Sequence, residues 1–235
     1  AGLYGACSTM AEGLALAACF AACGLADRAA ALTSSHFCTA ERQYRTPLTY
    51  GGKRTPTAQW TATAAGAVLL TPTGRGPQVG AVCFGRVRDF DVTDINNMGA
   101  AMAPAAAETL LRFFARSGRR PEDYDAIYTG DLGFVGSRLL LEILQSEGLP
   151  LQNHQDCGLL LYDRARQQVK AGGSGAGCSA AVLAAHILPG LAKGQLHRVL
   201  LVSTGALMSQ TTFLQGESIP GIAHLVELLA PGTPV

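Results

Sequence analysis

The stretch Gly5-Ala6-Cys7-Ser8-Thr9-Met10 leads directly into an apolar run from Ala11 to Ala26. Small residues followed by a long apolar segment predict a tight turn and then a buried helix, over about residues 8–24. The first N–H groups of such a helix are unpaired and its dipole is positive there, so a negative charge is stabilised. This environment lowers the pKa of a thiol, so Cys7 is either a prepared nucleophile or a small buried residue.

Composition excludes several classes of protein. The chain has 235 residues, of which 48% are hydrophobic and 15% charged, and its net charge is +1. This length and apolar content are enough for a large core or two fused halves. The small net charge gives no basic surface of the kind that binds nucleic acid. The seven cysteines form no C-x-x-C pair, and His154 and Asp156 lack further ligands at metal spacing. We therefore expect free thiols in a reduced compartment, no cofactor and no metal site.

The run over residues 10–26 is also the one candidate for a membrane span. It is interrupted by Glu12, has no basic flanks and is mostly alanine. A helix that is apolar on all sides can equally be the central helix of a large globular protein, which is the interpretation we favour. We therefore expect a soluble or peripheral protein without a signal peptide or transmembrane helix. Because the chain begins so close to Cys7, we also expect it to be the remainder of a longer protein.

Apolar periodicity along the rest of the chain predicts alternating strands and helices. The predicted strands cover about residues 29–34, 60–70, 79–88, 125–129, 158–162 and 198–204, and a last strand or buried segment lies near 220–229. The predicted helices cover about 96–116, broken or restarted at Pro104, then 135–147 and 178–193. This alternation is typical of a largely parallel or mixed sheet covered by helices. Residues 1–90 and 91–235 each look α/β, so we expect two related halves divided near residue 90.

The Gly-rich run from Ala171 to Gly177 invites comparison with a nucleotide-binding loop. Gly175, Gly177 and Ala180 satisfy G-x-G-x-x-A at the start of a predicted helix. However, about ten residues separate them from the preceding predicted strand, where the fingerprint needs a tight turn. We therefore expect these glycines to serve close backbone packing, and we predict neither dinucleotide nor ATP chemistry.

The polar loop over residues 35–59 is richer in chemistry. It carries His36 at the end of a predicted strand, and four cations: Arg42, Arg45, Lys53 and Arg54. Guanidinium forks hold carboxylates and phosphates, so the loop is either an anion site, a solvated surface or a subunit contact. Asp131 follows a predicted strand and Glu217 lies in a Gly- and Pro-containing turn. Each belongs to a plausible site loop, although each could also cap a helix.

Several segments together resemble a known family. G-A-C-S-T-M before an apolar helix, followed by T-A-T-A-A-G-A-V-L-L (61–70), is similar to the N-terminal half of the thiolase-like ketoacyl synthases. More specific segments resemble the stage V sporulation protein AD family: S-S-H-F-C-T-A-E-R-Q-Y-R (34–45), T-P-T-A-Q-W-T (55–61), N-N-M-G-A-A-M-A-P-A-A-A (96–107), T-G-D-L-G (129–133) and Q-G-E-S-I-P-G-I-A-H (215–224). The resemblance runs over essentially the whole chain. It implies an α/β thiolase-like fold of two related halves, with mixed sheets covered by helices and an incomplete N-terminal half.

The resemblance also bears on catalysis. In ketoacyl synthases a Cys nucleophile works with a His and an Asn. The similarity places Cys7 at the nucleophile, Gly130-Asp131 at the His position and Gly177 at the Asn position. Glycines supply no donor for a developing oxyanion, so the resemblance implies a binding protein and not an enzyme. The alternative is an acyl-thioester transferase or condensing enzyme that uses Cys7 alone.

The family binds dipicolinic acid, a small planar diacid, and works with membrane-embedded partners of the same sporulation transport complex, the SpoVA complex. The resemblance therefore implies dipicolinic acid, free or as its calcium chelate, as the ligand moved into and out of spores. It also implies a homodimer at the forespore or spore inner membrane. Such a diacid needs N–H groups, Arg and hydroxyls. The candidate ligand-binding residues are Cys7, Ser8, Thr9, His36, Asn97, Asp131 and Glu217, of which the two acids would repel a dianion unless protonated or bridged by calcium.

Overall fold

The structure, a computed structural model, describes residues 1–38 and 54–234. The strands are β1 (Ala29–Ser35), β2 (Trp60–Thr61), β3 (Ala64–Leu70), β4 (Gln78–Cys83), β5 (Ala126–Thr129), β6 (His154–Asp156), β7 (Gly173–Ser174), β8 (Arg198–Ala206) and β9 (Gly221–Leu229). The helices are α1 (Thr9–Ala22), α2 (Met98–Ser117), α3 (Gly133–Ser146), α4 (Cys157–Leu161), α5 (Arg164–Gln167), α6 (Ala176–Val182), α7 (Leu188–Ala192) and α8 (Gln210–Leu214). A 3-10 turn covers Pro121–Asp123, and a π-helical turn, Leu183–Ile187, joins α6 to α7.

A mixed five-stranded sheet is the frame of the fold. Its strand order is β4-β9-β8-β5-β6, in which β8, β5 and β6 are parallel and β9 is antiparallel to both neighbours. In this register Thr129 at the end of β5 lies opposite Val202 of β8 and Asp156 of β6. The carboxyl ends of these three strands therefore meet at one edge, as the predicted mixed α/β architecture requires. β4 joins this sheet although it comes from the first ninety residues, and the predicted division near residue 90 stays a prediction.

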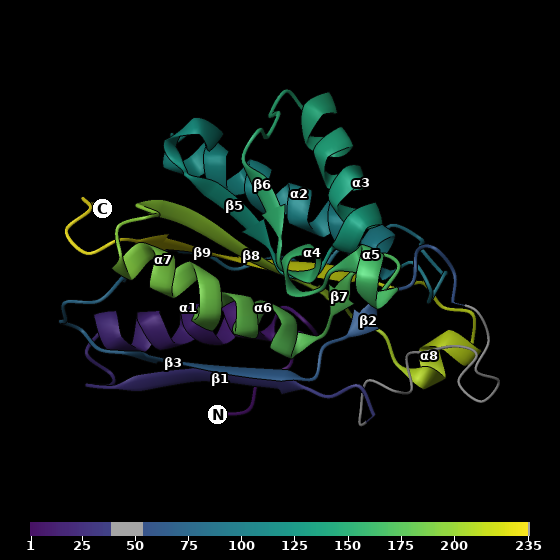
Figure 1. The fold of residues 1–235 in the computed structure, drawn as a ribbon, viewed down its shortest axis with the longest axis horizontal. Helices are drawn as coiled ribbons and strands as arrows, with labels where there is room; N and C mark the ends of the chain where they lie inside the picture. Colours follow the sequence, from purple (N-terminus) through teal and green to yellow (C-terminus); the bar gives the residue numbers. More distant parts are fainter. Residues whose placement is uncertain (39–53, 235) are drawn as a thin grey trace.

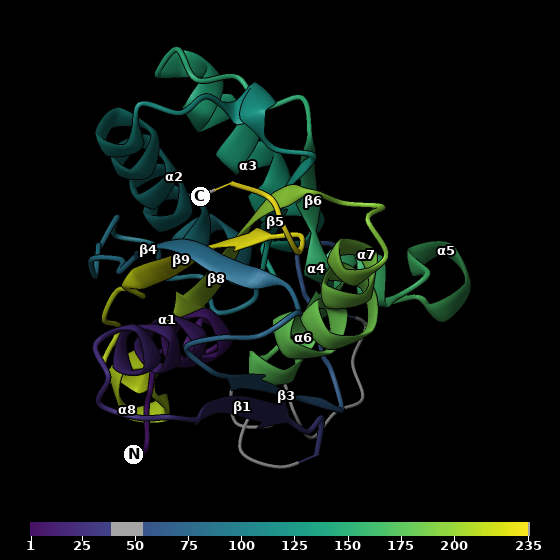
Figure 2. The same cartoon turned by 90° about the vertical axis from the view of Figure 1, so that its left-hand side faces the viewer.

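Helix α1 is the centre of the layered arrangement. With α6 it packs between the five-stranded sheet and the two-stranded antiparallel sheet of β1 and β3, while α2 and α3 cover the other face of the larger sheet (Figures 1 and 2). Met10, Ala11, Leu14 and Ala15 are buried, and the alanines let both sheets come close. The prediction of a buried central helix is confirmed. No helix among the described residues combines the length and the apolarity that crossing a membrane would require.

The predicted strand at 158–162 is wrong, because this segment forms α4. The strand comes just before it, as β6, and the side chain of Asp156 then caps the helix by accepting a hydrogen bond from Leu159 N at 3.2 Å. A short apolar run does not by itself distinguish a buried strand from a buried helix. The cap and the pairing with β5 decide the outcome here.

Other boundaries also differ from the predictions. Helix α2 runs through Pro104 without a break, since packing of its small residues on β9 and α3 outweighs the lost backbone hydrogen bond. The predicted strand at 60–70 is two strands with different partners, because β2 pairs with β7 and β3 pairs with β1. The strand predicted at 79–88 ends at Cys83, and the helix predicted at 178–193 includes the π-helical turn.

One carboxylate lies in the core of the five-stranded sheet with charged neighbours. Glu227 on β9 is fully buried. Its Oε1 accepts hydrogen bonds from Arg198 at 2.9 Å and from the Tyr124 hydroxyl at 3.0 Å, and it pairs with Arg119. Burial raises the pKa of Tyr124 to about 12. This cluster ties β9 to β8 and to the segment before β5.

We predict that Glu227→Met lowers the free energy of unfolding by about 1–3 kcal/mol, because it leaves the buried Tyr124 hydroxyl and the partly exposed Arg198 and Arg119 without their shared acceptor. The control is Arg88→Met, which breaks the solvent-exposed pair between Arg88 and Glu108 and should change stability little. Urea unfolding of both variants checks this. Equal losses in the two variants would contradict the assignment of Glu227 as the stabilising centre.

Candidate functional site

Polar groups from separate segments converge on Asp131 at the carboxyl edge of the five-stranded sheet. Asp131 follows β5 and is 1% exposed. Its carboxylate accepts hydrogen bonds from Ser174 Oγ at 3.0 Å, Gly175 N at 3.0 Å and Thr204 Oγ1 at 2.9 Å. We call these three donors the carboxylate cradle. They come from the Gly-rich run and from the end of β8, so the fold assembles a carboxylate-binding set around this one side chain.

Cys7 faces the cradle from a tight turn before α1. Ala6 has a positive φ of 51°, a conformation that is uncommon for a residue with a side chain. The Ser8 hydroxyl donates to Gly5 O at 2.6 Å, and the Thr9 hydroxyl donates to Ala6 O at 2.7 Å. Both hydroxyls therefore stabilise the turn that presents Cys7.

The predicted lowering of the Cys7 pKa is wrong. Burial raises the pKa of the Cys7 thiol well above its usual value, and the negative charge of Asp131 raises it further. The thiol also hydrogen-bonds to the Asp131 carboxylate, which favours the protonated thiol. Gly175 N–H and the Ser174 hydroxyl oppose the shift but do not reverse it. The backbone N–H that holds the Asp131 carboxylate is that of Gly175, at the start of α6 and not of α1.

A second buried carboxylate fixes the turn that carries Asp131. Asp156 accepts hydrogen bonds from Thr129 Oγ1 at 2.7 Å, Leu132 N at 2.9 Å and Gly133 N at 3.0 Å. Burial raises the pKa of Asp156 to about 6. Burial likewise raises the pKa of Asp131, against the opposing effect of Gly175 N–H. Asp156 thus binds both sides of the turn between β5 and α3.

The two glycines at the positions that the resemblance assigns to His and Asn have no space for a side chain. A Cβ at Gly177 would lie 2.2 Å from Ala64 O and 2.7 Å from Ser35 Oγ. A Cβ at Gly130 would lie 2.9 Å from Ser203 Cα. Gly177 N instead donates to Ser35 Oγ at 3.0 Å. These positions serve close approach between β1, β3, α6 and β8.

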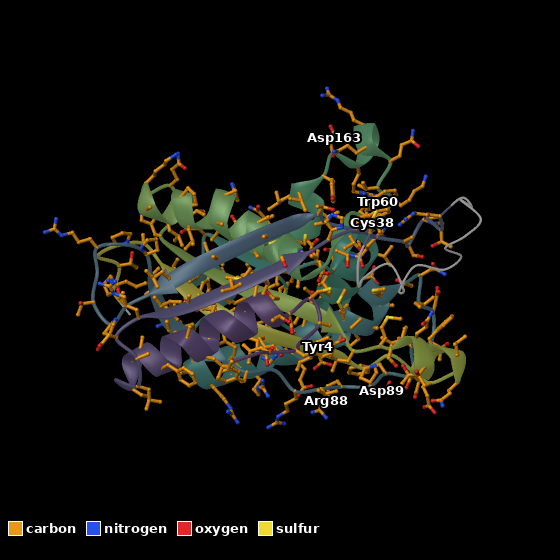
Figure 3. All side chains as sticks on the ribbon, turned by 90° about the horizontal axis from the view of Figure 1, so that it is seen from below. Tyr4, Cys38, Trp60, Arg88, Asp89 and Asp163 are labelled. Carbon is orange, nitrogen blue, oxygen red and sulfur yellow. The ribbon has the colours of Figure 1, made fainter. Side chains whose placement is uncertain are left out.

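His36 and the cationic loop lie at another edge of this region. His36 is exposed at the end of β1, and its Nδ1 accepts a hydrogen bond from Cys38 N at 3.1 Å. Cys38 lies near Trp60 (Figure 3), in keeping with the ring of Phe37 stacking on Trp60 at 4.6 Å. Of the predicted anion-binding cations, only Arg54 belongs to the described part of the chain. The other members of that set lie outside it: Arg42, Arg45 and Lys53.

Asn97 and Glu217 occupy different positions from Cys7. Asn97 directly precedes α2, and its buried Oδ1 has no hydrogen-bond partner among the described residues. Glu217 lies on an exposed turn after α8. Within residues 1–38 and 54–234, no hydrogen bond joins either side chain to Cys7 or Asp131. Of the predicted site residues, the structure brings together Cys7 and Asp131, with Ser8 and Thr9 supporting the turn.

Sequence reasoning missed the cradle donors and the role of Asp156. Ser174 and Gly175 belong to the Gly-rich run, which we interpreted as packing, and Thr204 ends a predicted strand without an assigned role. The signal that could have found them is topological, because carboxyl ends of parallel strands share one edge of a sheet. Within the part of the chain that the structure describes, no group of three or more His, Cys, Asp and Glu residues is arranged to hold a metal ion.

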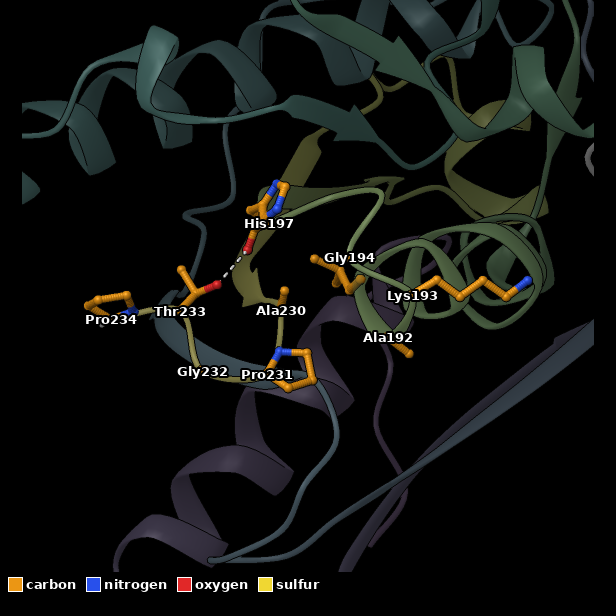
Figure 4. A pocket seen from close by; sticks show the side chains of 10 residues that line it. Ala192, Lys193, Gly194, His197, Ala230, Pro231, Gly232, Thr233 and Pro234 are labelled. Atoms are coloured by element: carbon orange, nitrogen blue, oxygen red, sulfur yellow. Dashed lines mark hydrogen bonds between the residues drawn. The ribbon is translucent and has the colours of Figure 1, made fainter.

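A cavity lies at the opposite end of β8. It has a volume of about 630 Å³ and is lined by residues 191–194, His197 and residues 230–234 (Figure 4). Strand β8 begins at Arg198, next to this cavity, and its Thr204 reaches the cradle at the other end. None of the predicted site residues lines the cavity.

Sequence comparisons identify relatives over almost the whole chain. The profile of the family described as Stage V sporulation protein AD (SpoVAD) matches residues 1–229. The Stage V sporulation protein AD of Bacillus subtilis (strain 168) is 48% identical over 223 residues. This match covers 94% of the chain and 66% of the relative, so the chain spans just under two thirds of that protein's length.

Solved structures with a similar fold are condensing enzymes by name. The tetronic acid condensing enzyme AbyA1 is 17% identical, with a TM-score of 0.57, and the match covers 97% of this chain and 67% of that one. The 3-oxoacyl-(acyl carrier protein) synthase III, FabH, from Pseudomonas aeruginosa PAO1 is 17% identical, with a TM-score of 0.54 and coverage of 99% and 67%. At this identity the likeness concerns the fold alone, and it confirms the predicted thiolase-like architecture.

We predict that Asp156→Asn destabilises the protein by about 1–3 kcal/mol, because an amide NH₂ would face a backbone N–H that now has an acceptor. The folded-state pKa of Asp156, about 6, is higher than that of an unfolded aspartate. The stability linked to this raised pKa is therefore complete below the unfolded pKa and is lost as the pH rises through about 6. The deficit of the variant should accordingly be larger at about pH 4.5 than at about pH 7.5.

Urea unfolding at the two pH values measures the Asp156→Asn deficit. Asp163→Asn is the matched control, since Asp163 is an exposed helix cap that bonds Ala165 N at 3.1 Å. Its deficit should be small at both pH values. A deficit of Asp156→Asn that is constant or grows with pH would contradict the role given to burial.

Proposed function

Because the chain belongs to the stage V sporulation protein AD family, we propose that it is a non-catalytic binding protein of bacterial sporulation whose ligand is dipicolinic acid. In this proposal the thiolase-like fold supplies the frame, and the region of Cys7 and Asp131 holds a small diacid without transforming it. The ligand is passed into and out of spores with membrane-embedded proteins of the same transport complex. The protein acts as a homodimer at the forespore or spore inner membrane.

The proposal that the protein is non-catalytic rests on the contact between the Asp131 carboxylate and the Cys7 thiol. Thiol catalysis requires thiolate, and both the burial of Cys7 and the charge of Asp131 suppress it. Acyl condensation also requires donors aimed at a developing oxyanion. The two positions that resemble the His and Asn sites are glycines without space for a side chain, Gly130 and Gly177. We therefore propose that the chain has the fold of an enzyme but that glycines replace the catalytic partners of Cys7.

The cradle supports a carboxylate ligand. Hydroxyls and backbone N–H groups are the donors that a small diacid needs, and Ser174, Gly175 and Thr204 already hold one carboxylate, that of Asp131. A free dianion would be repelled by ionised Asp131. A calcium chelate would instead present its cation to Asp131, and calcium prefers carboxylate oxygens. We therefore expect the chelate to bind when Asp131 is ionised, and the free diacid to bind when Asp131 is protonated.

Calorimetry with dipicolinic acid at neutral pH, with and without calcium, tests this proposal. The chelate should bind at least about tenfold more tightly than the free diacid, a difference of about 1.4 kcal/mol. Asp131→Asn should bring the two affinities within about threefold, because it removes the repelling charge. Asp163→Asn is the control and should keep the calcium dependence. A titration with calcium alone corrects for metal binding.

Two results would count against this proposal. A folded protein that gives no heat with either form of dipicolinic acid would exclude the ligand. An affinity for dipicolinic acid that changes neither with calcium nor in Asp131→Asn would show that the ligand binds away from the cradle.

The alternative is an acyl-thioester transferase or condensing enzyme that uses Cys7 as its nucleophile. It is favoured by the fold of the condensing enzymes and by the cysteine at the start of α1. Incubation with acyl-CoA followed by intact-protein mass spectrometry separates the two proposals. We expect Cys7 to stay unmodified. An acyl adduct that disappears in Cys7→Ser would favour the alternative.

A further inference from the structure

Two arginine–aromatic pairs lie on the surface beside the segments that carry the cradle. The guanidinium of Arg54 lies 4.0 Å from the ring centroid of Trp60, and that of Arg164 lies 4.3 Å from the ring of Phe134. Arg138 approaches the same Phe134 ring at 5.8 Å. These are cation–π contacts, in which a guanidinium lies over the face of an aromatic ring. Each contact therefore places a positive charge next to an apolar ring.

The two pairs are linked through the backbone of one buried segment. Trp60 is opposite Gly173 in the parallel pairing of β2 with β7, and Phe134 N donates to Ala171 O at 2.7 Å. Arg164 on α5 in turn donates to Lys170 O at 2.5 Å. The segment from Ala171 to Gly173 therefore connects the two pairs. We call the resulting set the basic tip: Arg54, Trp60, Phe134, Arg138, Arg164, Arg166 and Lys170.

Within residues 1–38 and 54–234, few acidic side chains pair with the cations of the basic tip. No ion pair between described residues involves Arg54, Arg138, Arg164 or Lys170. Arg166 has a solvent-exposed pairing with Asp163 at 3.5 Å, which is weak at such exposure. Apolar groups are exposed among these cations, since Phe134 is 40% and Leu160 of the adjoining α4 is 46% exposed. The exposed ring of Phe134 and the half-buried ring of Trp60 thus lie among cations that have no ion pair with a described residue.

The shape of the tip distinguishes between possible partners. Helix α5 stands out from the body of the molecule in Figure 2, and Asp163 at its start projects beyond Trp60 in a perpendicular view (Figure 3). A projecting surface offers no groove in which a peptide could place anchoring side chains. It does suit a broad, flat and negatively charged partner.

We propose that the basic tip is a membrane-contact surface that binds the head groups of anionic lipids directly. Arg and Lys side chains are attracted to an anionic leaflet, and Trp and Phe rings are stable at the depth of the head groups. Contact through the tip holds the protein at a bilayer without a spanning helix. This inference is independent of the ligand at Asp131, because the tip and the cradle use different side chains.

Vesicle binding tests the proposal on the unmodified protein. Vesicles of phosphatidylglycerol and phosphatidylcholine should bind it at least about tenfold more tightly than vesicles of phosphatidylcholine alone, and about 0.5 M salt should remove most of the difference. Trp60 is the only tryptophan of the chain, so its emission reports on the tip itself. It should shift to the blue on binding and be quenched by brominated lipid.

Charge reversal provides the matched variants. Arg54→Glu combined with Arg164→Glu should weaken binding to the anionic vesicles by about tenfold or more. Arg75→Glu combined with Arg116→Glu makes the same change of charge on the β3–β4 connection and at the end of α2, and should retain most of the binding. Thermal unfolding of both pairs checks that they fold.

Three results would overturn the proposal. The first is equal binding of neutral and anionic vesicles. The second is vesicle binding without any change in the emission or quenching of Trp60. The third is binding of soluble poly-glutamate but not of vesicles, which would assign the basic tip to an acidic protein partner.

Discussion

The hydrogen-bonded Asp131 carboxylate against the Cys7 thiol is the interaction on which the rest of the site depends. A carboxylate that is 1% exposed is costly to bury unless it is hydrogen-bonded. Here three donors from the Gly-rich run and from β8 satisfy it. Those contacts tie the turn after β5 to β7, to the start of α6 and to β8. Cys7, in the turn before α1, lies against the same carboxylate. The same carboxylate also keeps the thiol protonated, so one contact sets both geometry and chemistry.

Support for Asp131 comes from a second carboxylate one strand away. Asp156 binds two backbone N–H groups of the turn after β5 and also caps α4, so it fixes the loop on both sides. Backbone donors cannot rotate away as side chains can, and a turn held in this way has little freedom. A rigid, satisfied polar network is suited to holding a ligand in one position. The glycines at 130 and 177 permit the close backbone approach that the network needs.

Local patterns were sufficient for the frame of the fold and for its central helix. The apolar alanine-rich run predicted α1, and the strands β1, β5, β8 and β9 were placed within a few residues of their observed bounds. The strand predicted at 158–162 was wrong because a short apolar run does not distinguish a strand from a helix, and the pairing with β5 that places the strand at His154–Asp156 is a tertiary feature. The predicted direction of the Cys7 pKa shift was wrong for a related reason. The dipole of α1 is a local feature that the sequence shows, whereas the charge of Asp131 reaches Cys7 only through the tertiary structure. Asp131 is distant in sequence from Cys7 and from its cradle donors, and only the tertiary structure, including the pairing of β5 with β8, brings them together.

The most direct test of this account is the pKa of the Cys7 thiol. The rate at which Cys7 is alkylated can be followed against pH, with the peptide that contains Cys7 separated from the other cysteines by mass spectrometry. The account predicts a thiolate that forms only above the usual pKa of a thiol, and an apparent pKa that falls in Asp131→Asn because the nearby charge is removed. Full reactivity of Cys7 at or below neutral pH, unchanged by Asp131→Asn, would contradict it.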